Sequence, residues 1–423
     1  MRRLGAWAYN IAFFPFVVIL AYSLVLFNRK VRRGLRGRRR TLQRVRQFKE
    51  RSVDAYGPLY WFHAASLGEF EQARPIIEGL KEVSPDAQVV VSFFSPSGYE
   101  NCHHEMIDFK FYLPLDFPWV MRSILRILKP HRVLFASYDI WPNLIWACQQ
   151  AGIPTILFAA RIIPGSSKQW PVLRSFYRTL YRSMSAIYTV SSGDEERLRA
   201  IMGSPSSTTV LNLGNPRYDR VKARQRGKLT ANGERSNTIV LGSIHPEDED
   251  VIYDPLLRLL ENNGSLKVIW APHDPEPEVI DALAERLSSA GVKCSYYGRS
   301  NGQFGDDQVL LVDGVGYLAE LYYHGVVAYV GGGFGAQIHN VMEPAIASVP
   351  VFFGPRHHKS DEAEQLLSAG GGISISGGEE FARQLTAILG NPESREQMGL
   401  QAYRVIENNL GAAARIVQAI LAD

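Results

Sequence analysis

The stretch Leu59–Phe70 reads LYWFHAASLGEF and decides the fold class. Its first half is a largely apolar run of β-forming residues, and Gly68 follows where that run ends. A helical pattern then continues from about Phe70 to Val83, and a second β-rich run, QVVVSFFS, begins at Gln88. Buried strands that alternate with helices are typical of a parallel α/β sheet covered on both faces.

The same alternation continues through HRVLFAS, TILFAA and AIYTVS, and it restarts after the polar stretch Arg220–Asn237 with TIVLGS, LKVIWAP, QVLLVD and VVAYVGGG. We therefore predict two Rossmann-like domains, 41–219 and 238–393, that face a central ligand cleft in the GT-B manner, followed by a helical segment at 394–423. The alternative is a single large sheet with a long surface loop. Strand count argues against it, because open sheets rarely exceed about ten strands.

Composition limits the classes of function. The chain has 423 residues, 46% of them hydrophobic, which is enough for two domains with separate cores. The three cysteines form no C-x-x-C pair, so they predict neither a disulfide framework nor a zinc site, and a reducing compartment fits them. Residues 1–40 hold ten Lys and Arg, which leaves the rest with 36 basic and 42 acidic residues; this mildly acidic body excludes nucleic acid as a partner.

The N-terminal segment predicts membrane attachment. An uncharged apolar run, Ile11–Phe27, is followed by the basic cluster Arg29–Arg40, which would bind anionic headgroups and keep the following chain on the cytoplasmic face. We expect residues 1–40 to anchor the protein in the inner (cytoplasmic) membrane. Pro15 would kink a helix, so an interface-lying anchor stays open beside a single span. A cleaved signal peptide is the weaker alternative, since no small-residue cleavage site follows.

Glu69 is the candidate catalytic base. Ligands of doubly wound sheets bind at the carboxyl ends of strands, and Glu69 directly follows such an end after Ser66 and Gly68. A carboxylate there could take the proton from an attacking hydroxyl. Taken alone, the same residue could simply cap the helix that begins here.

A glycine-rich turn, Gly331-Gly332-Gly333, leads to Asn340 and Glu343 at a predicted helix start. Bare backbone N–H groups at a helix N-terminus form a phosphate site, and Glu343 could accept hydrogen bonds from ribose hydroxyls. Glycine-rich turns without a ligand are common, so this pattern is weak by itself.

Small, polar or histidine residues follow other predicted strands, as a sugar-nucleotide cleft requires: Ser97, Asp139, Asn215, Ser243 and His273. Metal binding has little support. The acidic run Asp248–Asp250 reads as a solvated face, and the adjacent pairs His103-His104 and His357-His358 do not converge on one ion. We expect no metal and no cofactor.

Read together, these residues resemble the bacterial 3-deoxy-D-manno-octulosonic acid (Kdo) transferase family, from the N-terminal anchor almost to the end of the chain. The resemblance rests on WFHAASLGE (61–69), YLPLD (112–116), IWPNL (140–144), Gly214-Asn215, Gly331-Gly332 through His339-Asn340, Glu343-Pro344-Ala345 and Phe353-Gly354-Pro355.

The resemblance implies a GT-B enzyme that moves Kdo from CMP-Kdo to a hydroxyl of a lipid A precursor, with inversion and without a metal. Glu69 would be the general base. The residues expected to bind the nucleotide are Gly331, Gly332, Gly333, Asn340, Glu343, Ser243 and His273. Those expected to bind the substrates are Ser66, Gly68, Ser97, Asp139, Arg161, Asn215 and Arg217.

The sequence departs from the family pattern at two places. Ser137-Tyr138-Asp139 stands where many members have Glu-Thr-Glu, and His273-Asp274-Pro275 stands where many have Arg-His-Pro. The second departure removes a cation expected near the nucleotide phosphate, for which Arg161 and Arg217 are candidates. A UDP-sugar-dependent GT-B enzyme acting on another membrane lipid is the rival enzyme reading. A non-catalytic nucleotide-binding scaffold is the rival of another class.

Overall fold

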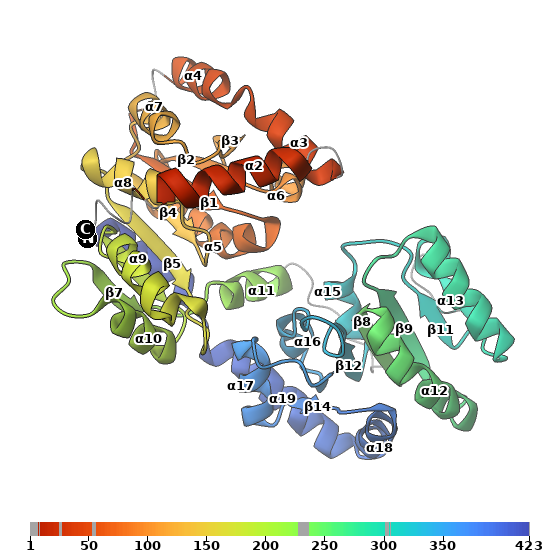
Figure 1. Cartoon of the computed structure of the whole chain (residues 1–423). Helices are drawn as coiled ribbons and strands as arrows, with labels where there is room; N and C mark the ends of the chain where they lie inside the picture. Colours follow the sequence, from red (N-terminus) through yellow and green to blue (C-terminus); the bar gives the residue numbers. More distant parts are fainter. Residues whose placement is uncertain are drawn as a thin grey trace. The chain divides into compact units, whose positions relative to one another are not determined.

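The computed structural model describes residues 7, 9–24, 28–52, 56–226, 237–300, 304 and 306–422 (Figure 1). They form two compact units. The first unit comprises Met1–Arg220 with Leu410–Asp423, and the second comprises Val221–Asn409. Each unit has its own seven-stranded parallel sheet and its own buried core.

The sheet of the first unit has the strand order β3-β2-β1-β4-β5-β6-β7. Its strands are β1 (Leu59–Ala64), β2 (Gln88–Phe93), β3 (Phe109–Tyr112), β4 (Arg132–Ala136), β5 (Thr155–Ala160), β6 (Ala186–Thr189) and β7 (Thr209–Asn212). Every residue of β1, β2, β4 and β5 is buried, which is why these strands read as continuous apolar runs.

Helices cover both faces of this sheet. Successive side chains of β1 point to opposite faces, so Trp61 packs under one helical layer and Phe62 under the other. The layer over Trp61 contains α7 (Pro118–Leu128), α8 (Pro142–Gln150) and α9 (Pro171–Tyr181). The layer over Phe62 contains α5 (Leu67–Val83) and α20 (Ala412–Ala422). The remaining helices are α6 (Pro96–Asn101), η2 (Ser167–Gln169), α10 (Ser192–Met202) and α11 (Arg217–Arg226).

The N-terminal segment packs onto the first unit. It comprises η1 (Tyr9–Phe13), α2 (Phe14–Leu24), α3 (Arg29–Arg38) and α4 (Thr41–Arg51), with Pro15 in the first turn of α2. Tyr9 and Phe14 are buried in the core of that unit. No single helix in the described part of the chain is long and apolar enough to cross a membrane. The predicted span stays a prediction, and residues 1–6, 8 and 25–27 of it lie outside the described residues.

Part of the basic cluster is engaged by the protein itself. The Arg38 Nε atom donates to the Leu113 carbonyl at 2.8 Å, and its guanidinium lies 4.2 Å from the centre of the Phe94 ring. Burial lowers the pKa of Arg38 to about 10. The expectation that the cluster faces lipid headgroups is therefore wrong for Arg38.

The second unit repeats the architecture with the strand order β10-β11-β9-β8-β12-β13-β14. Its strands are β8 (Thr238–Ile244), β9 (Lys267–Pro272), β10 (Cys294–Tyr296), β11 (Val309–Leu311), β12 (Val327–Val330), β13 (Val351–Phe353) and β14 (Gly372–Ser374). Its helices are α12 (Pro246–Asn262), α13 (Pro277–Ser289), α14 (Tyr297–Ser300), α15 (Leu318–Leu321), η3 (Tyr322–His324), α16 (Met342–Ile346), α17 (Asp361–Ala369), α18 (Gly378–Leu389) and α19 (Pro392–Asn408).

The predicted strands are all present. The structure also contains five short strands that were not predicted, and the helix α11. The predictions missed β3, β7, β10, β13 and β14, each of which has four residues or fewer and so carries little periodic signal. The expectation of a structure-poor stretch from Arg220 onward is wrong up to Arg226, because these residues form the second half of α11. The rest of that stretch, 227–236, lies outside the described residues.

Each sheet has one point at which the chain reverses the direction of strand addition. In the first unit this point lies between β1 and β4, and in the second between β8 and β12. Ligands of doubly wound sheets bind at the carboxyl ends of the strands on either side of such a point. Glu69, Asp139 and the glycine-rich turn follow such strands, and Ser97, Arg161 and His273 follow strands next to them.

Candidate functional site

Glu69 lies in the first turn of α5, directly after β1. The Ser66 side chain accepts a hydrogen bond from the Glu69 backbone N–H at 3.4 Å, and the Glu69 Oε2 atom accepts one from the Ala65 N–H. Glu69 therefore does help to cap the helix. A carboxylate has two oxygen atoms with several lone pairs, so capping through one oxygen is compatible with proton transfer at the other.

Asp139 brings a second carboxylate to this point from the loop after β4. Its Oδ2 atom accepts a hydrogen bond from the Trp141 indole at 3.1 Å and lies 3.0 Å from Nε2 of the buried His63. Burial, and next the negative charge of Asp139, raise the pKa of Glu69 to about 7. The structure thus places the Asp139 charge close enough to Glu69 to raise the pKa of Glu69. Such a pair of carboxylates is suited to proton transfer near neutral pH.

Two more predicted residues lie at the ends of neighbouring strands. Ser97 is in α6, after β2, and its hydroxyl is 3.0 Å from that of Ser95, the residue that caps this helix. Arg161 directly follows β5. Both are at the carboxyl edge of the first sheet, on opposite sides of Glu69 and Asp139 in the strand order.

Asn215 and Arg217 lie at the start of α11. The buried Asn215 side chain accepts a hydrogen bond from the Arg217 N–H at 3.1 Å. One turn further, Arg220 pairs with Glu71 of α5 at 2.6 Å. This ion pair brings the first turns of α11 alongside the turn that carries Glu69.

The glycine-rich turn after β12 is organised by Asp248, in the first turn of α12. The buried carboxylate of Asp248 accepts hydrogen bonds from the amides of Gly332 (2.6 Å) and Phe334 (3.3 Å) and from the Tyr329 hydroxyl (3.0 Å). The expectation of bare amides aimed at a phosphate is therefore wrong for Gly332 and Phe334. The expected solvated face is wrong for Asp248, because its partners lie up to 86 residues away in the chain.

The glycines of this turn are required by the packing of the backbone. A Cβ atom at Gly331 would lie 2.2 Å from the carbonyl oxygen of Ser243, and one at Gly333 would lie 2.5 Å from the amide of Gly354. Gly332 has a φ of +89°, a left-handed conformation that favours glycine. Ser243 itself has a φ of 55°, so the last residues of β8 are strained where they meet the turn.

Asn340 precedes α16, a helix of only five residues, and Glu343 lies in its first turn. The Asn340 side chain accepts a hydrogen bond from the Met342 N–H at 3.1 Å. Glu343 pairs with Arg224 of α11 at 3.0 Å. Asn340 thus provides an acceptor for the first amide of the helix, and the Glu343 carboxylate, expected to bind ribose hydroxyls, has a cationic partner in this structure.

His273 lies in a cluster with two histidines that were not predicted as site residues, His245 and His339. Burial, and next the neighbouring rings of His273 and His245, lower the pKa of His339 to about 4. Burial also lowers the pKa of His273. Spacing along the chain could not reveal the cluster, since His245 and His339 are 94 residues apart. The sequence could have indicated the cluster only through the position of each histidine, because each one lies in a loop that follows a central strand.

The adjacent pair His357-His358 does converge, contrary to expectation. The Nδ1 atoms of both rings lie within hydrogen-bonding distance of one oxygen of Glu364, at 2.8 and 2.9 Å. The two rings bend back onto the first turns of α17, so neighbours in the sequence reach one acceptor.

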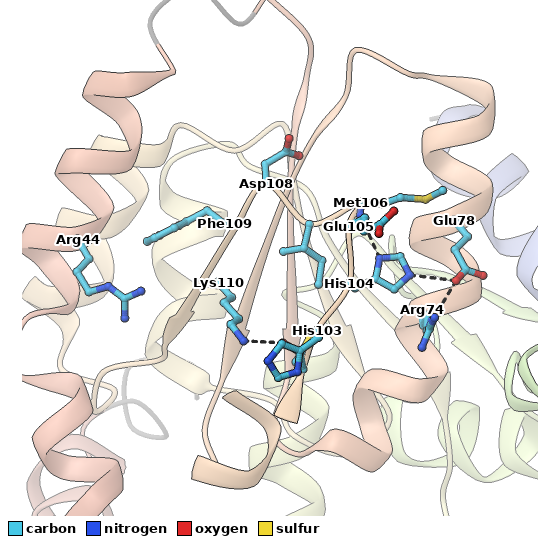
Figure 2. A pocket seen from close by; sticks show the side chains of 12 residues that line it. Arg44, Arg74, Glu78, His103, His104, Glu105, Met106, Asp108, Phe109 and Lys110 are labelled. Atoms are coloured by element: carbon cyan, nitrogen blue, oxygen red, sulfur yellow. Dashed lines mark hydrogen bonds and ion pairs between the residues drawn. The ribbon is translucent and has the colours of Figure 1, made fainter. Parts of the chain in front are cut away.

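A cavity of about 810 Å³ opens in the first unit beside α4, α5 and the segment that leads into β3 (Figure 2). Its basic side chains already have partners: Arg74 and His104 both pair with Glu78 at 3.0 Å, and Lys110 donates to the Tyr99 carbonyl at 2.8 Å. The lining segment precedes β3, whereas sites in such sheets follow strands. We do not include this cavity in the candidate site.

Comparisons with known proteins agree on one family. The family model described as 3-deoxy-D-manno-octulosonic-acid transferase (kdotransferase) matches residues 36–220. The 3-deoxy-D-manno-octulosonic acid transferase of Chlamydophila psittaci is 29% identical over 366 residues, which cover 82% of this chain and 81% of the relative. That of Haemophilus influenzae is 27% identical over 370 residues, which cover 84% and 85%.

Solved structures agree on the fold. The UDP-GlcNAc 2-epimerase of Neisseria meningitidis matches with a TM-score of 0.63 and 16% identity, over 87% of this chain and all of that one. This likeness supports the two-sheet GT-B architecture and nothing finer. By the family model over residues 36–220 and by the similarity that extends over most of the chain, the protein is similar to the 3-deoxy-D-manno-octulosonic acid transferases.

Proposed function

We propose that this enzyme transfers Kdo from CMP-Kdo to a hydroxyl group of a lipid A precursor in lipopolysaccharide biosynthesis, with Glu69 as the general base. The observation that carries the proposal is the carboxylate pair at the switch point of the first sheet, where the pKa of Glu69 is raised to about 7 beside Asp139. The names of the relatives support Kdo as the transferred group and transfer as the reaction class.

The reaction is a single displacement at the anomeric carbon of Kdo. The acceptor oxygen forms the new bond to that carbon as the bond to the phosphate oxygen breaks, so the configuration inverts and CMP leaves. Glu69 takes the proton of the acceptor hydroxyl during this step. Asp139, held by Trp141 and His63, keeps the affinity of Glu69 for that proton high through its charge.

We also propose that the first unit binds the cytoplasmic face of the inner membrane through α2 without requiring a span. Large apolar side chains are exposed on η1 and α2: Ile11, Phe13, Phe16, Val17, Ile19, Leu20, Tyr22 and Leu24. Phe14 packs on Phe117, which stacks on the exposed Trp119, so the apolar surface continues onto α7. Such a surface suits the boundary between headgroups and acyl chains, where the lipid acceptor is also found.

Incubation with CMP-Kdo and a lipid A precursor, read by product mass, tests the reaction. We expect the acceptor to gain the mass of Kdo, and we expect Glu69→Gln to lose this activity. Addition of a hexose from a UDP-sugar, with no use of CMP-Kdo, would favour the rival glycosyltransferase. Nucleotide binding with no transfer from either donor would favour a scaffold.

A further inference from the structure

Three histidines from separate loops meet at the switch point of the second sheet. His245 follows β8, His273 follows β9, and His339 lies in the loop after β12, and these three strands are neighbours in the sheet. One side-chain nitrogen from each ring lies within 4.8 Å of the other two. The Nε2 atoms of His245 and His339 are 2.7 Å apart, so at least one of the two presents a lone pair toward the cluster.

The backbone around the cluster is fixed by the sheet. The His273 N–H donates to the Ile244 carbonyl at 2.9 Å, next to His245, and the His339 N–H donates to the Gly331 carbonyl at 3.0 Å. Gly331 in turn donates to the Gly242 carbonyl of β8 at 2.9 Å. The three imidazoles are therefore mounted on rigid strand ends and not on independent loops, which is what a preorganised ligand site requires.

Ion pairing does not explain the cluster. Within the described residues, no carboxylate forms a salt bridge with any of these three rings. The nearby Asp248 uses its oxygens for backbone amides and for Tyr329, including the His245 N–H at 3.2 Å. The three imidazoles face one another without a carboxylate partner, and such rings can offer nitrogen lone pairs to a cation.

We propose that His245, His273 and His339 bind a transition-metal ion such as Zn²⁺ through one nitrogen each, with a fourth position open to an oxygen ligand. Three imidazoles and an open position are a common zinc arrangement, and imidazole also suits Ni²⁺ and Co²⁺. Tetrahedral zinc with N ligands at about 2.0–2.1 Å sets the nitrogens about 3.4 Å apart. The exposed His273 can turn toward the ion, and the close pair must separate by less than about 1 Å.

The glycine-rich turn beside the cluster indicates that a phosphate oxygen is the fourth ligand of the ion. A Cβ atom at Gly332 would lie 3.1 Å from the His339 ring, so the glycine-rich turn and the cluster are in contact. Asp248 occupies the Gly332 and Phe334 amides, so an incoming phosphate needs another positive group. The bound ion would supply that charge. This assignment of the fourth ligand rests on the proposed function, whereas metal binding itself does not.

Metal titration of the full-length, chelator-treated protein tests the site. We expect a single tight Zn²⁺ by calorimetry, and visible absorption of tetrahedral Co²⁺ when cobalt replaces it. His245→Gln, His273→Gln and His339→Gln should each weaken Zn²⁺ binding by at least about tenfold, the lower end of the cost of losing even a supporting group. His273 is exposed, so His273→Gln should keep the melting temperature of the apo protein and decides the matter if another variant fails to fold.

Two histidines outside the cluster serve as controls. His103→Gln, in the first unit, and His358→Gln, in the pair on Glu364, should leave Zn²⁺ affinity unchanged. The proposal would be overturned if all three cluster variants bound Zn²⁺ as tightly as the wild type does. It would also be overturned if His358→Gln lost Zn²⁺ binding.

Binding of CMP separates this inference from the proposed function. We expect Zn²⁺ to raise the affinity for CMP in the wild type and not in His273→Gln. Zn²⁺ binding without any effect on CMP would refute the phosphate as fourth ligand. Zn²⁺ binding in a protein that transfers no Kdo would refute the proposed function alone, and Kdo transfer without Zn²⁺ binding would refute the metal site alone.

Discussion

At the scale of single residues, the Glu69 carboxylate both holds the start of α5 by a hydrogen bond and has a pKa suited to a general base. Its carboxylate caps α5 through the Ala65 amide, and burial beside Asp139 raises its pKa to about 7. A cap needs only a hydrogen-bond acceptor, whereas a base needs a proton affinity matched to the pH of the cell. Substitutions that keep the first property and remove the second tell the roles apart.

The change Glu69→Gln keeps an acceptor oxygen and removes the proton acceptor. We expect single-turnover Kdo transfer to fall by roughly 10²–10⁴ while CMP affinity stays the same. Folding should not suffer, because the amide avoids the burial of a charge. A stable Glu69→Gln enzyme with normal turnover would show that the residue only caps the helix.

The pH dependence follows from the raised pKa of Glu69. The base must be ionised, so kcat/KM should rise with pH up to about 7 and level off above it. Asp139→Asn removes a charge that raises this pKa, so the acidic limb of the profile should move to lower pH. The folded protein holds this proton more tightly than the unfolded chain, so the ionised side chain costs stability as pH rises from 4.5 to about 7. The melting temperature of Glu69→Gln, relative to that of the wild type, should accordingly rise as pH increases over that range. A pH profile of kcat/KM that is the same in Asp139→Asn and the wild type would contradict the coupling between Asp139 and Glu69.

Asp248 is predicted to be structural, in contrast to its exposed neighbour Asp250. Asp248→Asn turns an acceptor of amide hydrogens into a group that also donates, so buried N–H groups lose partners at about 1–3 kcal/mol each. Asp250→Asn, in the same acidic run, should change the free energy of unfolding by less than about 0.5 kcal/mol. Urea denaturation compares the two, and equal stabilities would contradict this role of Asp248.

At the scale of elements, the N-terminal helix is part of the first unit and not a detachable anchor. The Tyr9 hydroxyl donates to Asp116 at 3.1 Å, and Asp116 also accepts the backbone N–H groups of Asn143 (2.8 Å) and Leu144 (3.1 Å) at the start of α8. Removal of residues 1–40 would expose this buried carboxylate. We therefore expect truncation to destabilise the first unit, which a lower melting temperature would show.

Neighbouring phenylalanines of α2 separate folding from membrane binding. Phe14 is 4% exposed and Phe16 is 64% exposed. Phe14→Ala should cost about 3–5 kcal/mol, the usual penalty for a cavity in a core. Phe16→Ala should cost less than about 0.5 kcal/mol but weaken flotation with anionic vesicles, because it removes apolar area from the exposed face. Equal vesicle binding by Phe16→Ala and the wild type would refute membrane contact through this face.

At the scale of the whole molecule, the chain enters the second unit near Arg220 and returns to the first near Leu410. The last helix, α20, packs on α5 through Ile416, Val417 and Ile420. The N-terminal and C-terminal helices thus contribute to one unit, while α19, which ends at Asn408, belongs to the other. The stability of the first unit should depend on the last residues of the chain.

Ile416→Ala tests this dependence. We expect it to cost about 2–5 kcal/mol, while Gln418→Ala, exposed on the same helix, should cost almost nothing. Hydrogen exchange resolves the two units, and protection should fall in β1 and α5 but not in β8 and α12. Equal loss of protection in both units would show that they unfold as one.

The sequence by itself determined the α/β class, the two-sheet architecture and the positions of the long strands, because a strand buried on both faces must be apolar throughout. It also identified Glu69, Asp139, the glycine-rich turn and His273 as residues at strand ends, because the carboxyl edge of a parallel sheet is where loops carry ligands. These are local properties, readable from a dozen residues at a time. Several strands of three or four residues, such as β10 and β13, were not predicted, because so few residues carry little periodic signal.

Only the tertiary structure decided which of these residues meet and what occupies their hydrogen bonds. The meeting of His245, His273 and His339 depends on the order β9-β8-β12 in the sheet, and the capture of the Gly332 amide by Asp248 depends on how α12 packs beside it. The pKa of Glu69 likewise depends on burial and on a carboxylate 70 residues away. Such long-range contacts arise from the packing of whole elements, which no local pattern of residues encodes.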